Sequence, residues 1–482
     1  MEVDLVEETL QSSVSHQAPH SHHIVTVPVD DAHPFDLEGY VANYSGRTVI
    51  TRLIHIVHIC PSIASEAFNL AVQHIHQSRD PLLYQQLLST YEVSGLQGAL
   101  PPVSDLKPLD TNWADSTMAK NQAEKLKLEV ELKSYTNNMI KESIRMGHRD
   151  LGDFHRSLGD FATALKHYTK SREFCTTSQH VLDMCLSVLE LLIEQKNYSH
   201  LPTYVFKADA ALDAANSAAT ATQPATTTIG GKKRSPERDS VQTKLDFATA
   251  LSNLGQGSYE KAAFHFLKLG PPKELGDWAG KLVAPGDIAI YGTLCALATY
   301  SRSALKAQVL DNADFSIYIE QEPYIRELVE SYMSSNFKTV LELLTRYSTR
   351  HYIDIHLAGH VHDLTALIRN WAIVLYFQPF SSIKLSRMST AFGWTIDQVE
   401  KHVVDLIQSG EIKARVDSQN KILQAKQTDY RADLFARSIK AAKDIQSANR
   451  KLLLRMRLQQ ADLIVKPPKG HHGLVMEYMQ GE

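Results

Sequence analysis

The stretch TIDQVEKHVVDLIQSGEIKARVDSQNKILQAK, residues 395–426, changes its pattern of apolar residues part-way along. As far as Gln408 the apolar residues recur at steps of three and four, which is the period of a helix with one buried face. In residues 411–417 apolar side chains alternate with charged ones, and a period of two is typical of a strand. A polar turn at 417–420 and a returning strand, suggested by Ile422, Gln424 and Lys426, complete a β-hairpin. The stretch therefore predicts a helix followed by a two-stranded wing.

The residues before this stretch supply the rest of a winged-helix domain. An apolar helix is expected over 362–377, and it must end before Pro379 because proline has no amide hydrogen for a helix interior. A short extended segment at 382–385 and a small helix ending near Phe392 follow. Helix, short strand, two helices and a hairpin are the order of a winged helix. The sequence thus predicts such a domain over residues 362–428.

Further upstream, a motif with offsets of 0, 2, 5 and 9 residues recurs. Two copies are close and two are looser: Gly159, Phe161, Ala164, Tyr168; Gly257, Tyr259, Ala262, Phe266; Lys196, Tyr198, Leu201, Val205; and Ser335, Phe337, Val340, Leu344. The aromatic residue at offset 2 can pack on the preceding helix, and the small alanine at offset 5 of the two close copies lets two helices approach closely. The spacing favours helix pairs of the tetratricopeptide type. A simple amphipathic hairpin is the alternative.

The chain is too long for one compact core, which stops growing near roughly 250–300 residues. We therefore expect a mostly α protein in which a tetratricopeptide-like helical-repeat solenoid leads into the winged helix and a C-terminal helix. The expected divisions are a disordered tail at 1–34, a helical-repeat domain at 35–208, a disordered Ala/Thr-rich insert at 209–240, a further helical region at 241–361, the winged helix at 362–428, a bundling helix at 429–466 and a tail at 467–482.

The bulk composition narrows the class of protein. The 482 residues carry a net charge of −4 and a pI near 6.6, whereas nucleic-acid-binding domains commonly have a pI above about 9. The four cysteines contain no CxxC pair, so they indicate neither a zinc module nor a disulfide framework. No run reaches the roughly 18 apolar residues of a membrane helix. We therefore expect a soluble protein of the nucleus and cytoplasm whose partners are proteins.

Several polar clusters could carry chemistry, and each lacks a required part. The histidine-rich stretch 351–363 includes the H-x-H core of a zinc peptidase, but Asn370 and Ile373 stand near where its Ser and Asp would fall. The run Gly230–Lys233 lacks the first glycine and the hydroxyl residue of a P-loop. The four histidines between positions 16 and 23 have no ligand spacing. We therefore predict no catalytic, cofactor-binding or metal-binding residues.

A winged helix can bind DNA through its second main helix. Here that helix, 395–408, carries Asp397, Glu400 and Asp405 against Lys401, and phosphates would repel a net negative helix. The small sheet offers another use, because the outer strand of a sheet carries unpaired N–H and C=O groups. A similar domain can add its own edge to that strand through backbone hydrogen bonds. The charge pattern therefore favours protein assembly over DNA binding.

Five stretches carry a family resemblance. They are FDLEGYVANYSGRT (Phe35–Thr48), LDTNWAD (Leu109–Asp115), IKESIRMGHRDLGDF (Ile140–Phe154), DIAIYGTLCALATYSR (Asp287–Arg302) and ARVDSQNKIL (Ala414–Leu423). Together with the order of repeats and winged helix, they resemble the PCI family, and within it the subunit-one family of the COP-nine signalosome. The resemblance covers roughly residues 35–466. It omits the histidine-rich tail and the Ala/Thr insert.

The resemblance implies a non-catalytic scaffold subunit. That complex removes the ubiquitin-like modifier Nedd8 from cullin-RING ubiquitin ligases, and a different, zinc-binding subunit is its peptidase. The implied partners are other PCI subunits, the remaining signalosome subunits including the zinc peptidase, and cullin-RING ligases, with no cofactor and no membrane. Two alternatives stay open. One is a PCI subunit of the 26S proteasome lid, and the other is a PCI protein that handles nucleic acid in mRNA export or translation initiation.

Two assembly interfaces are predicted at residue level. The wing interface, which would pair with other PCI subunits edge to edge, consists of Ile412, Lys413, Ala414, Arg415, Val416 and Ile422. The interface on the C-terminal helix consists of Leu434, Ile445, Leu452, Met456 and Leu463. An amphipathic helix with no following domain to cover its apolar stripe calls for partner helices. We expect this helix to enter a bundle with other subunits.

Overall fold

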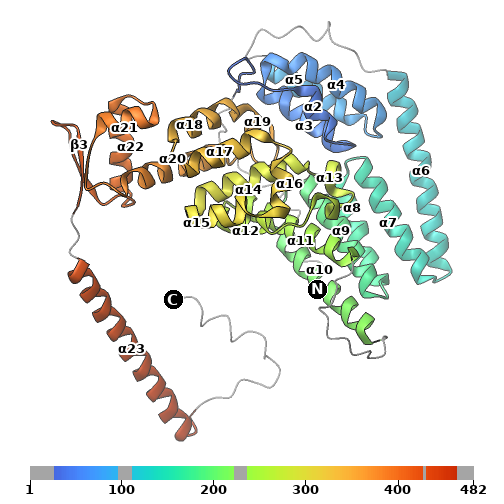
Figure 1. The fold of residues 1–482 in the computed structure, drawn as a ribbon. Helices are drawn as coiled ribbons and strands as arrows, with labels where there is room; N and C mark the ends of the chain where they lie inside the picture. The colour runs from blue at the N-terminus through green and yellow to red at the C-terminus, as the bar shows by residue number, and fades with distance from the viewer. Residues whose placement is uncertain (1–25, 96–110, 222–235, 427–429, 464–482) are drawn as a thin grey trace.

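The computed structural model describes residues 26–95, 111–221, 236–426 and 430–463 of the chain. It is mostly helical, with a small three-stranded sheet near the C-terminal end (Figure 1). Helical repeats precede a winged helix, so the predicted fold class is confirmed. No single helix within the described ranges is long and apolar enough to cross a membrane, although the bent pair Arg47–Ile59 and Pro61–Gln77 would meet that length and composition together.

The first helices form a small bundle with an apolar core of its own. They are α2 (Leu37–Ala42), α3 (Arg47–Ile59), α4 (Ala64–Gln77) and α5 (Leu82–Gly95), with a 3-10 turn at Pro61–Ile63. Asp36 starts α2 by accepting a hydrogen bond from the Gly39 amide at 3.1 Å. Leu53 and Phe68 are fully buried between these helices. The bundle packs against later segments as well, since Ile353 belongs to the same core.

The segment ahead of this bundle is packed rather than free. Val27 is 4% exposed, and its amide donates to the carbonyl oxygen of Ile59 at the end of α3. The predicted disordered tail at 1–34 is therefore wrong for residues 26–34, because Val27 finds an apolar site and a backbone partner. The rest of that prediction, residues 1–25, falls outside the described residues.

The central helices are arranged as hairpins, as the repeated motif predicts. They are α6 (Thr111–Asn137), α7 (Lys141–Ser157), α8 (Phe161–Ser171), α9 (Ser178–Glu194), α10 (Leu201–Ala221), α11 (Pro236–Gly255) and α12 (Tyr259–Leu267). α7 packs on α8, α9 on α10 and α11 on α12 (Figure 1). A later hairpin of the same kind joins α17 (Pro323–Met333) to α18 (Phe337–Arg346).

The first residue of each motif occupies one particular backbone position. Gly159, Lys196, Gly257 and Ser335 have φ values of 81°, 59°, 74° and 65°. Each amide bonds the carbonyl three residues earlier, and the next amide bonds the carbonyl five residues before itself. This pattern is a Schellman helix ending, in which a left-handed residue reverses the chain. The motif therefore begins at the residue that turns the first helix of a pair into the second.

The predicted Ala/Thr-rich insert, 209–240, is wrong at both ends. α10 continues as far as Ala221, and α11 already begins at Pro236. The physical reason is helix propensity, since the run from Ala208 to Ala221 is dominated by alanine, the best helix former. Residues 222–235, the remainder of the prediction, lie outside the described ranges.

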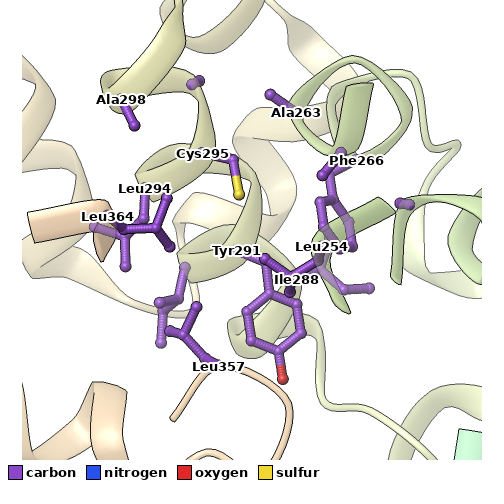
Figure 2. Packing of buried hydrophobic residues seen from close by; sticks show 14 of the residues in the cluster. Leu254, Ala263, Phe266, Ile288, Tyr291, Leu294, Cys295, Ala298, Leu357 and Leu364 are labelled. Atoms are coloured by element: carbon purple, nitrogen blue, oxygen red, sulfur yellow. The ribbon is translucent and has the colours of Figure 1, made fainter. Parts of the chain in front are cut away.

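α14 (Pro285–Thr299) runs through the middle of the fold and is buried on every side. Each residue from Gly286 to Ala298 is buried. Figure 2 shows Tyr291 and Cys295 of this helix among side chains of α11, α12 and the segment that enters α20. A helix that is apolar all round belongs in a core rather than at a surface. α14 therefore ties the repeat helices to the C-terminal domain.

The remaining segments lead into the winged helix. They are α13 (Trp278–Lys281), α15 (Arg302–Leu305), a π turn at Lys306–Leu310, α16 (Ala313–Ile319), α19 (Ser348–Ile353), α20 (Val361–Phe377), β1 (Ser382–Lys384), α21 (Leu385–Phe392), α22 (Ile396–Gln408), β2 (Ala414–Asp417) and β3 (Ile422–Ala425). Gly393 ends α21 in the left-handed conformation. Thr395 and Gln398 then form a reciprocal capping box that starts α22.

The sheet has the strand order β1-β3-β2, and both pairings are antiparallel. Leu423 in β3 is fully buried beneath the domain's helices, and it faces Ile383 in β1 and Val416 in β2. After the sheet, α23 (Tyr430–Gln460) stands apart from the rest of the chain (Figure 1). The described residues of this helix are all exposed.

Candidate assembly surfaces

The outer edge of β2 carries unpaired backbone groups. The Lys426 amide donates to the Lys413 carbonyl at 2.9 Å, so this pair faces inward across the β2–β3 ladder. Because hydrogen-bonded residues alternate along an antiparallel strand, Arg415 also faces β3. The backbone N–H and C=O groups of Ala414 and Val416 point away from the sheet. The predicted wing interface thus includes a free edge, and two of its residues present the backbone groups.

One residue of the predicted wing interface cannot serve as part of that edge. Ile422 lies on β3, which is paired with β1 on one side and with β2 on the other. Its backbone groups are used within the sheet, so the prediction is wrong for an edge role of Ile422. Ile412 is 4% exposed and belongs to the domain's core cluster. This leaves 413–416 as the part of the predicted interface that can meet another strand.

A second free edge exists on β1, and the sequence did not reveal it. The Ala425 amide donates to the Ser381 carbonyl at 2.8 Å, so Ile383 is the residue of β1 that also faces β3. The backbone groups of Ser382 and Lys384 therefore point outward. Both side chains are exposed, and a shallow pocket lies beside them. Three residues are too few to show a period of two, which is why β1 could be predicted only as an extended segment.

The acidic face of α22 is partly engaged in holding the wing. Glu400 accepts hydrogen bonds from the Lys421 ammonium and from the Ser418 hydroxyl, both at 2.5 Å. The bond from Lys421 is the main cause that lowers the pKa of Glu400. The Asp417 carboxylate accepts hydrogen bonds from the backbone amides of Gln419 and Asn420, which closes the turn between β2 and β3. These contacts fix the orientation of β2 relative to α22.

α23 combines an exposed apolar stripe with a basic surface. The five residues predicted as its interface are 52–70% exposed: Leu434, Ile445, Leu452, Met456 and Leu463, the last just beyond the helix. Within 430–460 the sequence holds eight Lys and Arg residues but only Asp433 and Asp444 as acids. A helix of 31 residues with this much exposed apolar surface would gain stability from partner helices. A single chain does not test the predicted contact of α23 with partner helices, which stays a prediction.

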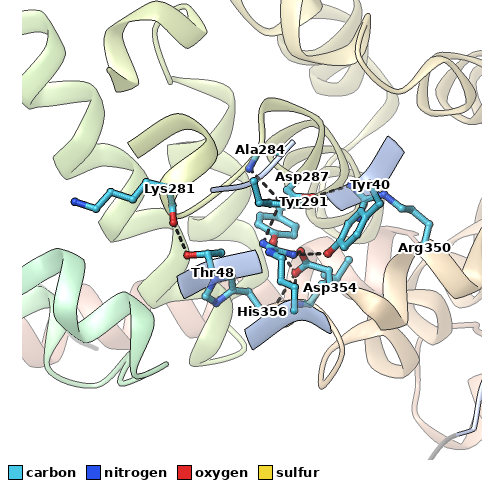
Figure 3. A network of polar contacts seen from close by, with 12 residues as sticks. Tyr40, Thr48, Lys281, Ala284, Asp287, Tyr291, Arg350, Asp354 and His356 are labelled. Atoms are coloured by element: carbon cyan, nitrogen blue, oxygen red, sulfur yellow. Dashed lines mark hydrogen bonds and ion pairs between the residues drawn. The ribbon is translucent and has the colours of Figure 1, made fainter. Parts of the chain in front are cut away.

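A buried polar network joins the first helices to the C-terminal half (Figure 3). Arg52 of α3 donates to Asp354 at 2.7 Å and to Asp287 of α14 at 3.2 Å. Arg350 of α19 donates to the other oxygen of Asp287 at 2.7 Å. Tyrosine hydroxyls donate further hydrogen bonds to these carboxylates; the hydroxyl of Tyr291, for example, donates to Asp354 at 2.5 Å. We call these residues, with Tyr40, Tyr44, Glu322 and His356, the junction network.

The junction network holds charges that are almost completely removed from solvent. The side chain of Arg52 is 1% exposed, that of Asp287 0% and that of Asp354 2%. Although burial opposes ionisation, the Arg52 guanidinium beside Asp354 holds the pKa of that carboxyl well below its usual range. Two arginines and two aspartates thus neutralise one another inside the protein. The arrangement positions the first helical bundle against α14 and α19, which is a structural role.

The comparisons with known proteins agree with this architecture. A family model described as 26S proteasome subunit RPN7 matches residues 110–308, and a PCI domain model matches residues 344–427. COP9 signalosome complex subunit 1 of Arabidopsis thaliana is 34% identical over 436 residues, which span 89% of this chain and 91% of that protein. The chain belongs to the COP9 signalosome subunit 1 family.

Other members of the COP9 signalosome subunit 1 family align over similar lengths. Subunit 1b of Drosophila melanogaster is 32% identical over 89% of this chain and 86% of its own length. The 26S proteasome non-ATPase regulatory subunit 6 of Dictyostelium discoideum is 22% identical over 34% of this chain and 42% of its own length. The predicted resemblance to the signalosome family is therefore confirmed, and the relation to the proteasome subunit is confined to part of the chain.

In this member of the COP9 signalosome subunit 1 family, three of the four histidines of 351–363 bond to separate tyrosines, while exposed His362 lies beside Asp363. His351 bonds Tyr324 at 3.0 Å, while His356 bonds Tyr198 at 2.7 Å. His360 lies at the N-cap of α20 and is 3.2 Å from the hydroxyl of Tyr259. No group of three or more His, Cys, Asp or Glu among the described residues could hold a metal ion. Burial lowers the pKa of His351 and of His356 to about 3.

Proposed function

We propose that this chain is a scaffold subunit of a COP9 signalosome and supports the removal of Nedd8 from cullin-RING ligases by another, zinc-binding subunit. The observation that carries the proposal is the winged-helix sheet with two free edges, β1 and β2. Membership of the subunit 1 family supports the choice of complex. The buried junction network supports a structural role, because it fixes helices rather than presenting reactive groups to solvent.

Two free edges on one small sheet suit assembly with two neighbours. If β2 of one subunit meets β1 of the next, the contact is head-to-tail and can continue through several related subunits. Backbone hydrogen bonds supply the attraction, while nearby side chains select the neighbour. Lys384 in β1 and Arg415 in β2 are both basic, so acidic residues on the adjoining subunits would complement them.

α23 supplies a second contact of a different kind. Its apolar stripe would enter a helical bundle with the remaining subunits, and its excess of Lys and Arg makes acidic partner helices the favourable ones. The strand edges and α23 follow one another in the sequence, with only residues 427–429 between the described ends. A subunit held at both places would be fixed in position and in orientation.

Native affinity purification of the tagged chain from its own cells, followed by mass spectrometry, tests the choice of complex. We expect recovery of a multi-subunit assembly that includes a zinc peptidase, other PCI proteins and cullins. Recovery of proteasome base and lid subunits instead would assign the chain to the alternative complex and overturn the deneddylation proposal. Recovery of mRNA-export or translation factors with RNA would support the third class of function.

Replacement of Ala414 with proline tests the β2 edge. The Ala414 amide points away from β3, so proline removes an outward donor while the hydrogen bonds between β2 and β3 remain. We expect Ala414→Pro to lose incorporation into the complex while the isolated chain keeps its far-UV circular dichroism. Ala414→Ser is the matched control, because it retains the amide at the same position. Normal assembly of the folded Ala414→Pro chain would rule out pairing at this edge.

A further inference from the structure

A pocket of about 490 Å³ lies between the β1 edge of the sheet and α21. We call it the β1 pocket. Its lining residues come from the strand, from the segment before it and from one flank of α21: Phe380, Ser382, Ile383, Lys384, Ser386, Arg387 and Thr390. The outward backbone groups of Ser382 and Lys384 border this pocket. A strand added to β1 would therefore cover it.

The β1 pocket carries two positive charges and no negative one. Lys384 and Arg387 both line it and are exposed, while no acidic side chain does so. Neither cation forms an ion pair with a described residue. The guanidinium carbon of Arg387 lies 5.8 Å from the centre of the Phe380 ring, a contact that leaves the N–H groups of the arginine available. The pocket therefore favours a carboxylate from a partner.

The alternation of side chains determines which residue of an added strand would enter the β1 pocket. Ile383 is 5% exposed and lies on the helix side of β1, whereas the side chains of Ser382 and Lys384 are exposed on the other face. Residues directly opposite one another in paired strands place their side chains on the same face. The residue opposite Ile383 would therefore point toward α21 and Arg387. One position of the incoming strand is thus read by the pocket.

A glutamate at that position matches the chemistry of the wall. Its carboxylate can accept two parallel hydrogen bonds from the guanidinium of Arg387, which is the strongest geometry for such a pair. The hydroxyl of Ser386 lines the same pocket and can donate a further bond. The two methylene groups of a glutamate can lie against the apolar parts of the wall, Phe380 and Ile383. Aspartate, with one methylene group, has a shorter reach.

We propose that the β1 pocket selects the neighbour of this subunit by receiving a glutamate from the strand that pairs with β1, and that Arg387 binds its carboxylate. This inference rests on the proposed function, because it requires β1 to pair with another subunit. Backbone hydrogen bonds alone discriminate little between related strands, so side chains beside the edge must supply the selectivity. Arg387 is then the residue that sets the specificity of this edge.

A second copy of this chain is an unfavourable occupant. Its β2 edge exposes Lys413 and Arg415 on the face of the sheet that carries Lys384 in β1, so like charges would meet. The acid of β2, Asp417, already accepts hydrogen bonds at both carboxylate oxygens, from the Gln419 amide and the Asn420 side chain. A copy therefore offers cations where the pocket needs a free carboxylate. The neighbour at β1 should be a different chain.

Hydrogen exchange of the assembled complex tests the role of Arg387. Pairing at β1 should protect the outward amides of 382–384, and a reversed charge in the pocket would repel the incoming glutamate. We expect Arg387→Glu to reduce the protection gained on assembly at least about tenfold, and Arg387→Lys to retain most of it. Arg387 is exposed, so both variants should fold. Lys261→Glu, at an exposed position on α12, is the matched control and should change nothing.

The natural chain separates failure of this inference from failure of the proposed function. If its amides at 382–384 gain no protection on assembly, β1 does not pair with a neighbour, and both proposals are overturned at this edge. If they gain protection and Arg387→Glu gains it equally, pairing at β1 stands and only the role of Arg387 is overturned.

Zero-length carbodiimide cross-linking identifies the occupant, because this reagent joins an amine to a carboxylate only in direct contact. Arg387→Lys places an amine in the pocket, and we expect peptide mass spectrometry to link position 387 to a glutamate of another subunit. Replacing that glutamate with arginine should restore the protection lost in Arg387→Glu. A link to a second copy would overturn the proposal. So would the absence of any link while Lys421 reacts with Glu400, its partner at 2.5 Å.

Discussion

At the scale of single residues, the junction network is the place where loss of one charged side chain should be most costly. Arg52 bonds two aspartates and the hydroxyl of Tyr40 in an interior that excludes water. A buried ion pair adds little net stability compared with apolar packing, but the loss of one partner leaves a charge without compensation. The network therefore makes stability depend on the presence of each member. It also fixes which segments meet, because no apolar contact would require that particular arrangement.

Replacement of Arg52 with methionine should cost about 3–5 kcal/mol of unfolding free energy, because Asp354 would lose its cation while staying buried. Urea unfolding of the isolated chain measures this loss. Arg79→Met is the control, since the pair of Arg79 with Glu124 has side-chain exposures of 52% and 42%, and surface pairs contribute at most about 1 kcal/mol. Equal losses for the two variants would show that the junction network does not act as described.

The buried histidines predict sensitivity to acid. His351 and His356 are neutral in the folded protein because burial lowers the pKa of each to about 3, whereas an unfolded histidine titrates near 6.5. As pH falls below about 6.5, these histidines take up protons in the unfolded chain but stay neutral in the folded chain. The stability present at neutral pH is therefore progressively lost. Each histidine contributes about 2 kcal/mol to this loss between pH 7.5 and 5.

Urea unfolding at a series of pH values checks the acid sensitivity. His356→Gln should reduce the slope of unfolding free energy against pH between 6.5 and 4 by up to one proton, since that residue no longer titrates. Exposed His362 provides the control, because it is not part of the buried set and His362→Gln should leave the slope unchanged. A stability curve that is flat from pH 7.5 to 5 would refute the assignment of neutral buried histidines.

At the scale of elements, substitutions in α23 should affect assembly of the complex without affecting the stability of the isolated chain. Leu452 is 61% exposed, so Leu452→Glu should leave the thermal unfolding midpoint of the isolated chain within about one degree. In the complex the same change would bury a charge in an apolar bundle, and we expect loss of co-purifying subunits. Leu452→Met keeps the apolar surface at the same position and should assemble normally. A complex that tolerates Leu452→Glu would exclude α23 from the bundle.

At the scale of the whole molecule, stability should be distributed unevenly along the chain. α14 is buried on every side and belongs to the large core cluster, whereas the described side chains of α23 are all exposed. Amides open most easily where few apolar contacts hold the helix. Hydrogen exchange of the isolated chain should therefore protect α14 at least about a thousandfold more than α23. Comparable protection of the two helices would mean that α23 is packed on its own chain.

The sequence by itself determined the elements and their class. The change of period within 395–426 marked α22 and the strands of the wing, because side-chain alternation follows directly from backbone geometry. The spacing of the repeated motif marked the hairpins for the same reason, since its first position is the left-handed residue of each turn. The error at the insert, 209–240, arose where composition was weighed above the helix propensity of alanine.

Only the tertiary structure decided which distant residues meet. Arg52 is separated from Asp287 by 235 positions along the chain and from Asp354 by 302. No local period of the sequence connects these residues. The same holds for the free edge of β1, whose pairing with β3 spans the whole of α21 and α22. Local patterns reflect forces between neighbours in sequence. Burial of charge, strand order and cavities depend on how the complete set of helices packs, and this packing exists only in the folded chain.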